Sequence, residues 1–203
     1  MDYLERRMLV YAGIIMCMIP LIFCGLALGQ ETTANRININ DIFIYTGWMG
    51  DGEDYDRSIL NFEPFHADNP HSSATCIKFS YVFGPQKWAG IYWQNEPNNW
   101  GDEPGNNYSG KGLKKITFWA RGETGNEIVE FKAGGINESE KKYKDSFSAT
   151  IGRQTLSKEW KEYEIDLSQA DLTSVIGGFC WVARAEYNSG KEIVFYLDDI
   201  YLE

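Results

Sequence analysis

Short alternating runs of aromatic and β-branched residues, separated by Gly, Asn, Asp and Pro, dominate the sequence after residue 40. This alternation is typical of β-strands, because side chains two residues apart lie on one face of a strand. No stretch in this part has a convincing helical period. Since the connections are short, we expect an all-β fold, a two-sheet antiparallel β-sandwich of the jelly-roll type. The predicted strands are residues 41–46, 75–83, 89–94, 115–121, 127–133, 146–151, 161–166, 178–185 and 193–202.

The N-terminal residues 1–29 have the features of an export signal. Arg6 and Arg7 precede an uncharged run, residues 8–28, and small residues at Ala27 and Gly29 predict cleavage before Gln30. The same run is long enough to span a bilayer, so an uncleaved membrane anchor is the alternative and the only membrane contact that we expect. In both cases a short lead (residues 30–40) and one domain (residues 41–203) would be secreted or displayed at the cell surface.

The charge of the chain excludes one class of partner. It contains 19 basic and 29 acidic residues, a net charge of −10 at pH 7. Nucleic-acid binding requires a basic surface, so this partner is not expected. Aromatic residues make up 15% of the chain and include seven tryptophans. The composition therefore predicts a folded, acidic and aromatic-rich domain, which we expect to be a monomer.

Two cysteines, Cys76 and Cys180, lie outside the N-terminal segment. An even number of cysteines in an exported domain favours a disulfide. Alternation places neither residue plainly in the core, and whether the two meet depends on the order of the strands. We expect them to pair, with two free thiols as the alternative.

Alternation also divides the polar residues between the faces of the sheets. In residues 127–133, Val129, Phe131 and Ala133 are expected to point inward, which leaves Glu130 and Lys132 on the opposite face. The same reasoning gives one polar sheet face with Glu186 at its edge. For each residue alone a solvated surface is the simpler explanation, but their grouping favours a binding face. The expected ligand-binding residues on this face are Tyr92, Gln94, Glu130, Lys132, Arg184 and Glu186.

Two tryptophans fall in polar segments that are expected to be loops. Trp48 lies in residues 47–52, and Trp100 lies in the amide-rich residues 94–105. A tryptophan in a loop is expected either to pack against the sandwich or to contact a ligand, because leaving its large apolar surface in water is unfavourable. Aromatic faces suit the C–H faces of sugar rings, and amides and carboxylates can bind hydroxyl groups. With the acidic charge, these features favour a neutral polysaccharide as ligand and Trp48 and Trp100 as stacking residues.

Three segments resemble the galactose-binding-like jelly rolls, which include many carbohydrate-binding modules attached to glycoside hydrolases. They are Trp-Ala-Gly-Ile-Tyr-Trp-Gln at 88–94, the strand ending in Phe-Trp-Ala-Arg-Gly at 113–122, and Phe-Tyr-Leu-Asp-Asp-Ile within 194–200. Residues 155–163 resemble the strand that lies between the last two. The resemblance spans residues 41–203. It implies a non-catalytic domain that binds a glycan on a concave sheet face or at the loop edge.

The resemblance also implies a structural calcium ion. Many relatives hold Ca²⁺ between an acid of an early loop and an acid on the last strand. Asp199 matches the last-strand position, and Asp51 offers a carboxylate of the right type in an early loop. Turn stabilisation by these acids is the alternative, and no cofactor is required.

Two other classes of function remain open. An enzyme would need a catalytic constellation, and the best carboxylate pair, Glu164 and Asp166, lacks the final acid of the laminarinase-type motif that it resembles. The two histidines, His66 and His71, make at most a weak metal site. If Arg121, Arg184 and Tyr92 lie next to one another in the fold, they could support lyase-type chemistry. A cell-surface interaction domain without glycan binding is the third class.

Overall fold

The computed structural model describes residues 35–190 and 192–203. It confirms the predicted all-β fold, two antiparallel sheets packed into a sandwich. One four-residue helix, α1, accompanies the strands in this part of the chain. The elements are β1 (Ile37–Asn38), α1 (Ile39–Ile42), β2 (Ile44–Gly50), β3 (Leu60–His66), β4 (Cys76–Tyr81), β5 (Trp88–Gln94), β6 (Lys115–Gly122), β7 (Ile128–Gly134), β8 (Ser148–Thr155), β9 (Lys161–Asp166), β10 (Gly177–Arg184) and β11 (Ile193–Leu202).

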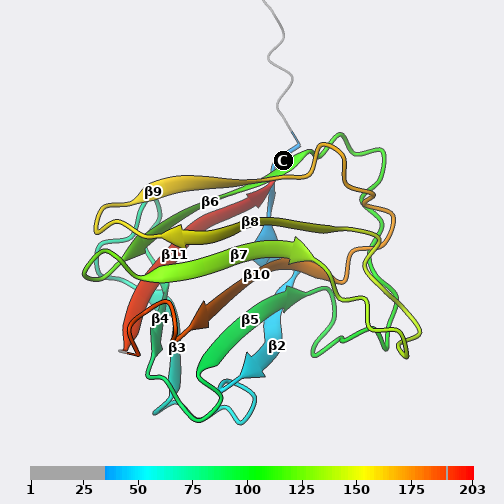
Figure 1. Ribbon diagram of the computed structural model, residues 1–203. Coiled ribbons are helices and arrows are strands. Elements are labelled where there is room, and N and C mark those ends of the chain that lie inside the picture. Colours follow the sequence, from blue (N-terminus) through cyan, green and yellow to red (C-terminus); the bar gives the residue numbers. More distant parts are fainter. Residues whose placement is uncertain (1–34, 191) are drawn as a thin grey trace, which may run out of the picture. The chain divides into compact units, whose positions relative to one another are not determined.

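The strands form two sheets with many crossovers between them (Figure 1). Sheet I has the order β3-β4-β11-β6-β9, with β1 paired to β11. Sheet II has the order β2-β5-β10-β7-β8. Because neighbouring strands come from distant parts of the sequence, residues around 90, 130 and 180 lie side by side in sheet II.

The core between the sheets is built from the inward-facing residues that alternation predicts. Val129, Phe131 and Ala133 are fully buried, as are Phe179 and Trp181 on the neighbouring strand. Aromatic rings fill much of the space: Phe79, Phe118, Phe131, Phe179, Phe195, Trp93 and Trp181 pack against one another at angles from stacked to edge-on. The high aromatic content is thus largely explained by the core.

Several elements differ from the prediction: the two-residue β1 was not predicted, and β8 ends at Thr155, four residues beyond the predicted end at residue 151. Residues 39–42 form the helix α1, capped by the Asn38 side chain, which accepts from the Asn40 amide, so the strand expected from residue 41 begins only at Ile44. That strand then continues through the predicted loop to Gly50. Strand β3 was not predicted, because its sequence contains Pro64 and polar residues; it lies at the edge of sheet I, where proline is tolerated.

The predicted disulfide is wrong. Cys76 and Cys180 are both free and buried. Cys76 begins β4 of sheet I, whereas Cys180 lies within β10 of sheet II, where it pairs with Tyr92 and Lys132 on the side away from the core. The strand order therefore places the two thiols on different sheets. Burial raises the pKa of both, that of Cys76 to about 11, so neither thiol is activated.

The expected signal or anchor at residues 1–29 lies outside the described residues. In the described part, no helix is long and apolar enough to cross a membrane.

Three long loops gather at one end of the sandwich, on the right in Figure 1. They comprise residues 95–114, 135–147 and 167–176. An isolated bridge between Asn106 and Val175 joins the first to the third, and the Tyr143 amide donates to the Gly101 carbonyl, which joins the first to the second. These loops border the outer face of sheet II.

Candidate functional site

The register of sheet II places the polar and aromatic side chains of its outer face in rows across the strands. Cys180 pairs with Tyr92 on one side and with Lys132 on the other. Val182 pairs in the same way with Gly90 and Glu130, and Arg184 pairs with Trp88. Directly paired residues lie on the same face of a sheet, so Tyr92, Glu130, Lys132 and Arg184 share one face.

A second hydrophobic cluster, separate from the main core, lies on this outer face. Its buried members are Tyr92, Ile136, Ile176, Cys180 and Val182, and the half-buried Met49, Trp88, Trp100 and Tyr143 pack against them. Small clusters of this kind form where long loops pack over a sheet. Here it unites strands β2, β5 and β10 with all three long loops, through Trp100, Ile136, Tyr143 and Ile176.

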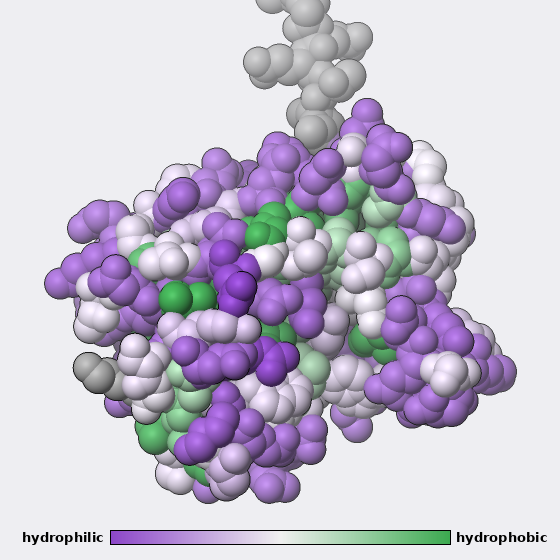
Figure 2. Space-filling view, in the orientation of Figure 1, coloured by the Kyte–Doolittle hydropathy of each residue, from purple (hydrophilic) through white to green (hydrophobic). Residues whose placement is uncertain are grey.

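A hollow of about 510 Å³ opens beside this cluster. Trp88, from the start of β5, and Trp100, from the loop after β5, both line it, and Gly90 and Val182 lie in the row of sheet II between Trp88 and Tyr92. We call this hollow, together with the three adjoining outer-face rows of sheet II that contain Trp88, Gly90 and Tyr92, the groove. Figure 2 shows, in the orientation of Figure 1, a mostly hydrophilic surface with hydrophobic residues visible between the polar ones. The hollow is lined by Trp48, Met49, Glu53, Tyr55, Trp88, Asn98, Trp100 and Glu138.

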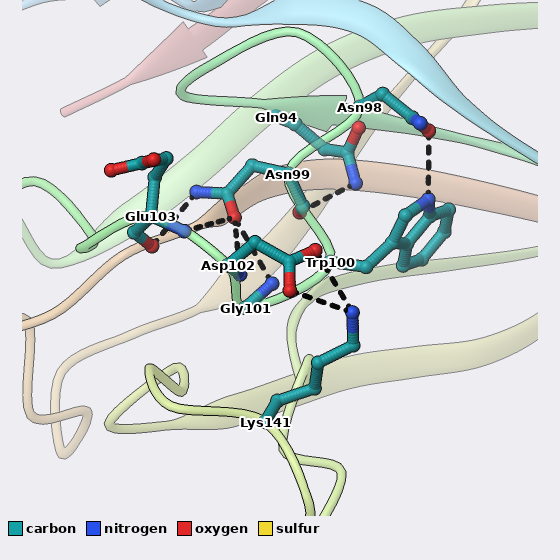
Figure 3. A network of polar contacts seen from close by, with 8 residues as sticks. All are labelled: Gln94, Asn98, Asn99, Trp100, Gly101, Asp102, Glu103 and Lys141. Atoms are coloured by element: carbon teal, nitrogen blue, oxygen red, sulfur yellow. Dashed lines mark hydrogen bonds and ion pairs between the residues drawn. The ribbon is translucent and has the colours of Figure 1, made fainter.

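The loop that carries Trp100 is held by the side chain of Asn99 (Figure 3). The Asn99 Oδ1 accepts from the backbone amides of Gly101, Asp102 and Glu103 at 3.0–3.1 Å. Its Nδ2 donates to the Asn95 side chain and to the Glu103 carbonyl. Asn99 is only 2% exposed. With all its hydrogen-bonding groups used internally, it fixes the loop in one conformation.

Trp100 points away from this network (Figure 3). Its indole N–H donates to Asn98 Oδ1 at 2.9 Å, and its ring stands edge-on against Tyr92. From the loop at residues 135–147, Lys141 binds Asp102 at 2.8 Å. Three contacts therefore fix the position of Trp100: the hydrogen bond to Asn98, the ring contact with Tyr92, and the ion pair that holds the neighbouring Asp102.

Two of the predicted binding residues are buried supports. Gln94 is 0% exposed; its Nε2 donates to the Asn99 carbonyl, and its Oε1 accepts from Thr46 Oγ1. Tyr92 is 6% exposed, and its hydroxyl donates to the Gly134 carbonyl. Alternation placed both on the correct face, but Trp100 and the long loops cover them. Neither has a polar group free for a ligand.

Trp48 also differs from its prediction. It lies in β2 and pairs with Ile91, so it faces the core side of the sheet. Its ring packs edge-on against Phe62 and tilted against Tyr55. Trp48 is half-buried and lines the hollow, while Met49, its neighbour in β2, belongs to the outer face.

The remaining predicted residues are accessible. Glu130 and Lys132 are half-buried on β7, and Arg184 is exposed at the end of β10. The Arg184 guanidinium lies 5.4 Å from the centroid of the Trp88 ring. Glu186 is exposed in the turn after β10, beyond the paired rows. The structure thus brings Glu130, Lys132 and Arg184 to the groove and leaves Glu186 outside it.

A buried carboxylate ties the loop at residues 135–147 to the groove. Asp145 accepts from the backbone amides of Ile136, Ile176 and Gly177. Burial raises its pKa to about 6, although these three hydrogen bonds act in the opposite direction. Asp145 is thus the buried group that holds two of the long loops to sheet II.

Sequence reasoning missed several residues of the groove. Trp88 has the same strand parity as Tyr92, so alternation within β5 could have identified it. Arg153 pairs with Glu130 and becomes recognisable only once β8 is placed beside β7. Met49 lies on the edge strand β2, and Glu138 and Tyr143 lie in the loop at residues 135–147. Local sequence patterns do not predict where such residues meet the groove.

The expected calcium ligands do not fit a shared site. Asp51 accepts from the Tyr81 hydroxyl and the Gln86 amide, and Asp199 lies 2.7 Å from His71 Nδ1 and accepts from Ser72. Tyr81 pairs with Ile193 at the start of β11. Asp199 lies six residues along that strand, roughly 20 Å away at about 3.3 Å per residue. In the described residues, no group of three or more His, Cys, Asp or Glu is arranged to hold a metal.

The candidate catalytic residues are also dispersed. Glu164 forms an ion pair with Lys115, and the Asp166 carboxylate accepts a hydrogen bond from the Ser168 amide; both acids lie on β9 of sheet I. Arg121 lies on β6 of sheet I with its guanidinium 3.6 Å from the Tyr196 ring centroid, so it does not neighbour Arg184 or Tyr92. His66 contacts Glu63 and His71 contacts Asp199, so the two histidines form no joint site.

Comparison with solved structures identifies the fold. The family 11 carbohydrate-binding module of the cellulosomal cellulase Lic26A-Cel5E of Clostridium thermocellum aligns with a TM-score of 0.51 and 16% identity, over 84% of this chain and 95% of that chain. The fold is the jelly roll of carbohydrate-binding modules. The resemblance seen in the sequence is confirmed at this level.

Two further structures agree. A family 11 module from Clostridium thermocellum in complex with a β-1,3-1,4-mixed-linked tetrasaccharide aligns at a TM-score of 0.51 and 16% identity, over 82% of this chain and 94% of that one. A family 30 carbohydrate-binding module aligns at a TM-score of 0.50 and 11% identity, over 83% and 98%. No protein-family model matches the sequence, and the search of curated proteins finds no match.

Proposed function

We propose that the protein is an exported, monomeric, non-catalytic module that binds a polysaccharide chain in the groove. The observation that carries this proposal is the hollow lined by both Trp88 and Trp100 on the outer face of sheet II. The jelly-roll fold shared with carbohydrate-binding modules supports it.

The two indoles suit stacking against sugar rings. Each is half-buried, so part of each ring system remains accessible. The indole N–H of Trp100 is already bonded to Asn98, which leaves the ring face as its interaction surface. Sugar rings present weakly positive C–H groups to the negative face of an aromatic ring. Because Asn99 holds the loop, little conformational entropy is lost on binding.

Polar groups around the indoles can bind hydroxyls. Asn98 Nδ2 can donate, and the exposed carboxylates of Glu53 and Glu138 can accept. Such groups fix the orientation of a sugar that stacking alone would leave free.

The carboxylates of the groove support binding without hydrolysis. A glycosidase needs one carboxyl group kept protonated, usually by burial or by a nearby like charge. Glu53 and Glu138 are exposed and Glu130 is half-buried. This arrangement suits hydrogen bonding better than proton transfer.

A glycan array with the full protein and two variants tests the proposal. We expect reproducible binding to at least one glycan, and its loss in Trp88→Ala and Trp100→Ala. Trp160→Ala is the matched control, because Trp160 donates to the Asn69 carbonyl at sheet I. No binding by folded protein, or equal loss in the control, would overturn the proposal.

A further inference from the structure

Three cationic side chains lie on the part of the groove formed by β10, β7 and β8. Lys132 pairs with Cys180 in one row, and Glu130 pairs with Arg153 in the next. Arg184 lies in the following row beside Trp88. These side chains come from three adjacent strands, β10, β7 and β8, and share the outer face of sheet II. We call Lys132, Arg153 and Arg184 the basic end of the groove.

In the described part of the chain, the basic end forms no close ion pair with a protein carboxylate. Among the described residues, none of the three cations has a carboxylate oxygen within 4.0 Å, whereas Lys115, Lys141 and Arg36 each do. Glu130 is the one carboxylate paired into these rows. The outer face of strands β7, β8 and β10 therefore carries three cations and one anion, in a chain with ten more acidic than basic residues.

Aromatic rings position the two arginines. The Arg184 guanidinium lies 5.4 Å from the Trp88 ring centroid, and that of Arg153 lies 4.1 Å from the Tyr187 ring centroid. A guanidinium held against a ring keeps its N–H groups at the edge, where they can form paired hydrogen bonds with a carboxylate or sulfate. Both arginines are exposed, so these donors are accessible to a ligand.

The groove is thus polarised along its length. The tryptophan hollow with Glu53 and Glu138 lies at the β2–β5 end; Arg184 adjoins it through Trp88, and Lys132 and Arg153 lie farther across, on β7 and β8. From β5 to β8 there are three strand spacings, roughly 14 Å at about 4.8 Å each. A chain of sugars crossing the strands would place one unit between the indoles and a later unit at the basic end.

We infer that the ligand is an anionic polysaccharide, whose carboxylate or sulfate groups bind Lys132, Arg153 and Arg184. This inference rests on the proposed function, and it replaces the neutral glycan that the overall charge favours. The net charge of −10 describes the whole chain, but the register of sheet II concentrates cations at this one place.

The test compares polymers that differ in charge but not in backbone, with a neutral glucan of another backbone as reference. Isothermal titration of the full protein would use polygalacturonate, the same polymer with its carboxyl groups methyl-esterified, and mixed-linked β-glucan. A chondroitin sulfate arm, set against unsulfated chondroitin, separates sulfate from carboxylate recognition. We expect at least tenfold tighter binding to a charged polymer than to its uncharged or less charged counterpart, with affinity falling as salt rises.

Variants locate the effect. Arg184→Gln and Lys132→Gln should weaken binding of the charged polymer about tenfold and weaken binding of the esterified one by a clearly smaller factor, so that the preference for charge shrinks. Lys114→Gln, an exposed cation outside sheet II, is the control and should change neither. Equal affinity for charged and esterified polymer, or binding of β-glucan alone, would overturn the inference and leave the proposed function standing. Absence of binding to every glycan, also on the array, would overturn both.

Discussion

The Trp100 indole stands edge-on against the Tyr92 ring, with 5.8 Å between the ring centroids and 87° between their planes. Tyr92 is anchored through its hydroxyl to Gly134, so a residue of β5 joins the loop after β5 to the end of β7. The contact holds the Trp100 ring in place at the groove before any ligand binds.

Removal of the Trp100 ring should weaken glycan binding strongly while the protein stays folded. Trp100→Ala loses one of the two stacking surfaces, and we expect affinity to fall at least tenfold, or about 1.4 kcal/mol. The ring also packs against Tyr92 and its cluster, so we expect a loss of about 1–3 kcal/mol in the free energy of unfolding. Titration with a glycan that binds the unaltered protein, together with thermal unfolding, measures both. Unchanged affinity would place the ligand elsewhere.

Asn99 should matter more for the loop than any exposed residue in it. Asn99→Ala leaves three backbone amides without their acceptor, and we expect a loss of about 2–3 kcal/mol in the free energy of unfolding. Urea denaturation measures this loss, and hydrogen exchange at Gly101–Glu103 should accelerate. Asn107→Ala is a control, since Asn107 accepts only from the exposed Ser109 and should cost under about 1 kcal/mol. Equal costs in the two variants would refute the special role of Asn99.

Asp145 should make stability fall as pH rises through the weakly acidic range. Its pKa is raised to about 6 in the folded protein by burial, above the ordinary 3.8. A raised pKa adds stability that is complete below the unfolded pKa and is lost as pH rises through the folded pKa. Relative to Asp145→Asn, we therefore expect the free energy of unfolding to fall by on the order of 1–3 kcal/mol between about pH 4 and 6.

Urea denaturation of both proteins across this pH range isolates the contribution of Asp145, because other titrating groups are common to the two. A carboxyl ¹³C titration by NMR gives the pKa directly. Stability that rises with pH relative to Asp145→Asn would mean that the three amide hydrogen bonds outweigh burial.

The two buried thiols should remain unlinked. Alkylation in denaturant without reductant should modify both Cys76 and Cys180, which peptide mass spectrometry would detect, and a reductant should leave the melting temperature unchanged. Their positions in different sheets require this outcome. A Cys76–Cys180 disulfide peptide would contradict the strand order.

The local pattern of the sequence predicts most of the strands and the faces of their residues. It succeeds where both neighbours of a strand are in the sheet, as for Val129 and Phe131 in β7, because burial on one side enforces alternation. It fails at the edge strand β3, where Pro64 and polar residues are tolerated. A strand's face also does not determine exposure: Gln94 lies on the predicted face but is covered by the loop that Asn99 holds.

The site depends more on strand order than on local pattern. Trp88 and Arg184 are almost a hundred residues apart and become neighbours only through the pairing of β5 with β10. Arg153 and Glu130 meet through the pairing of β7 with β8. No local rule gives such pairings, so the sequence suggested the kind of residues that a glycan site needs but not the set that forms the groove.

The measurement that tests the central claim most directly is NMR mapping of a bound glycan on the ¹⁵N-labelled protein. The indole N–H signals of Trp88 and Trp100 should shift on titration with a glycan selected from the array, together with backbone signals of Gly90 and Val182. The indole signals of Trp119 and Trp160, which surround His71 at sheet I, should stay in place. Shifts confined to Trp119 and Trp160, or none with any glycan, would contradict the account.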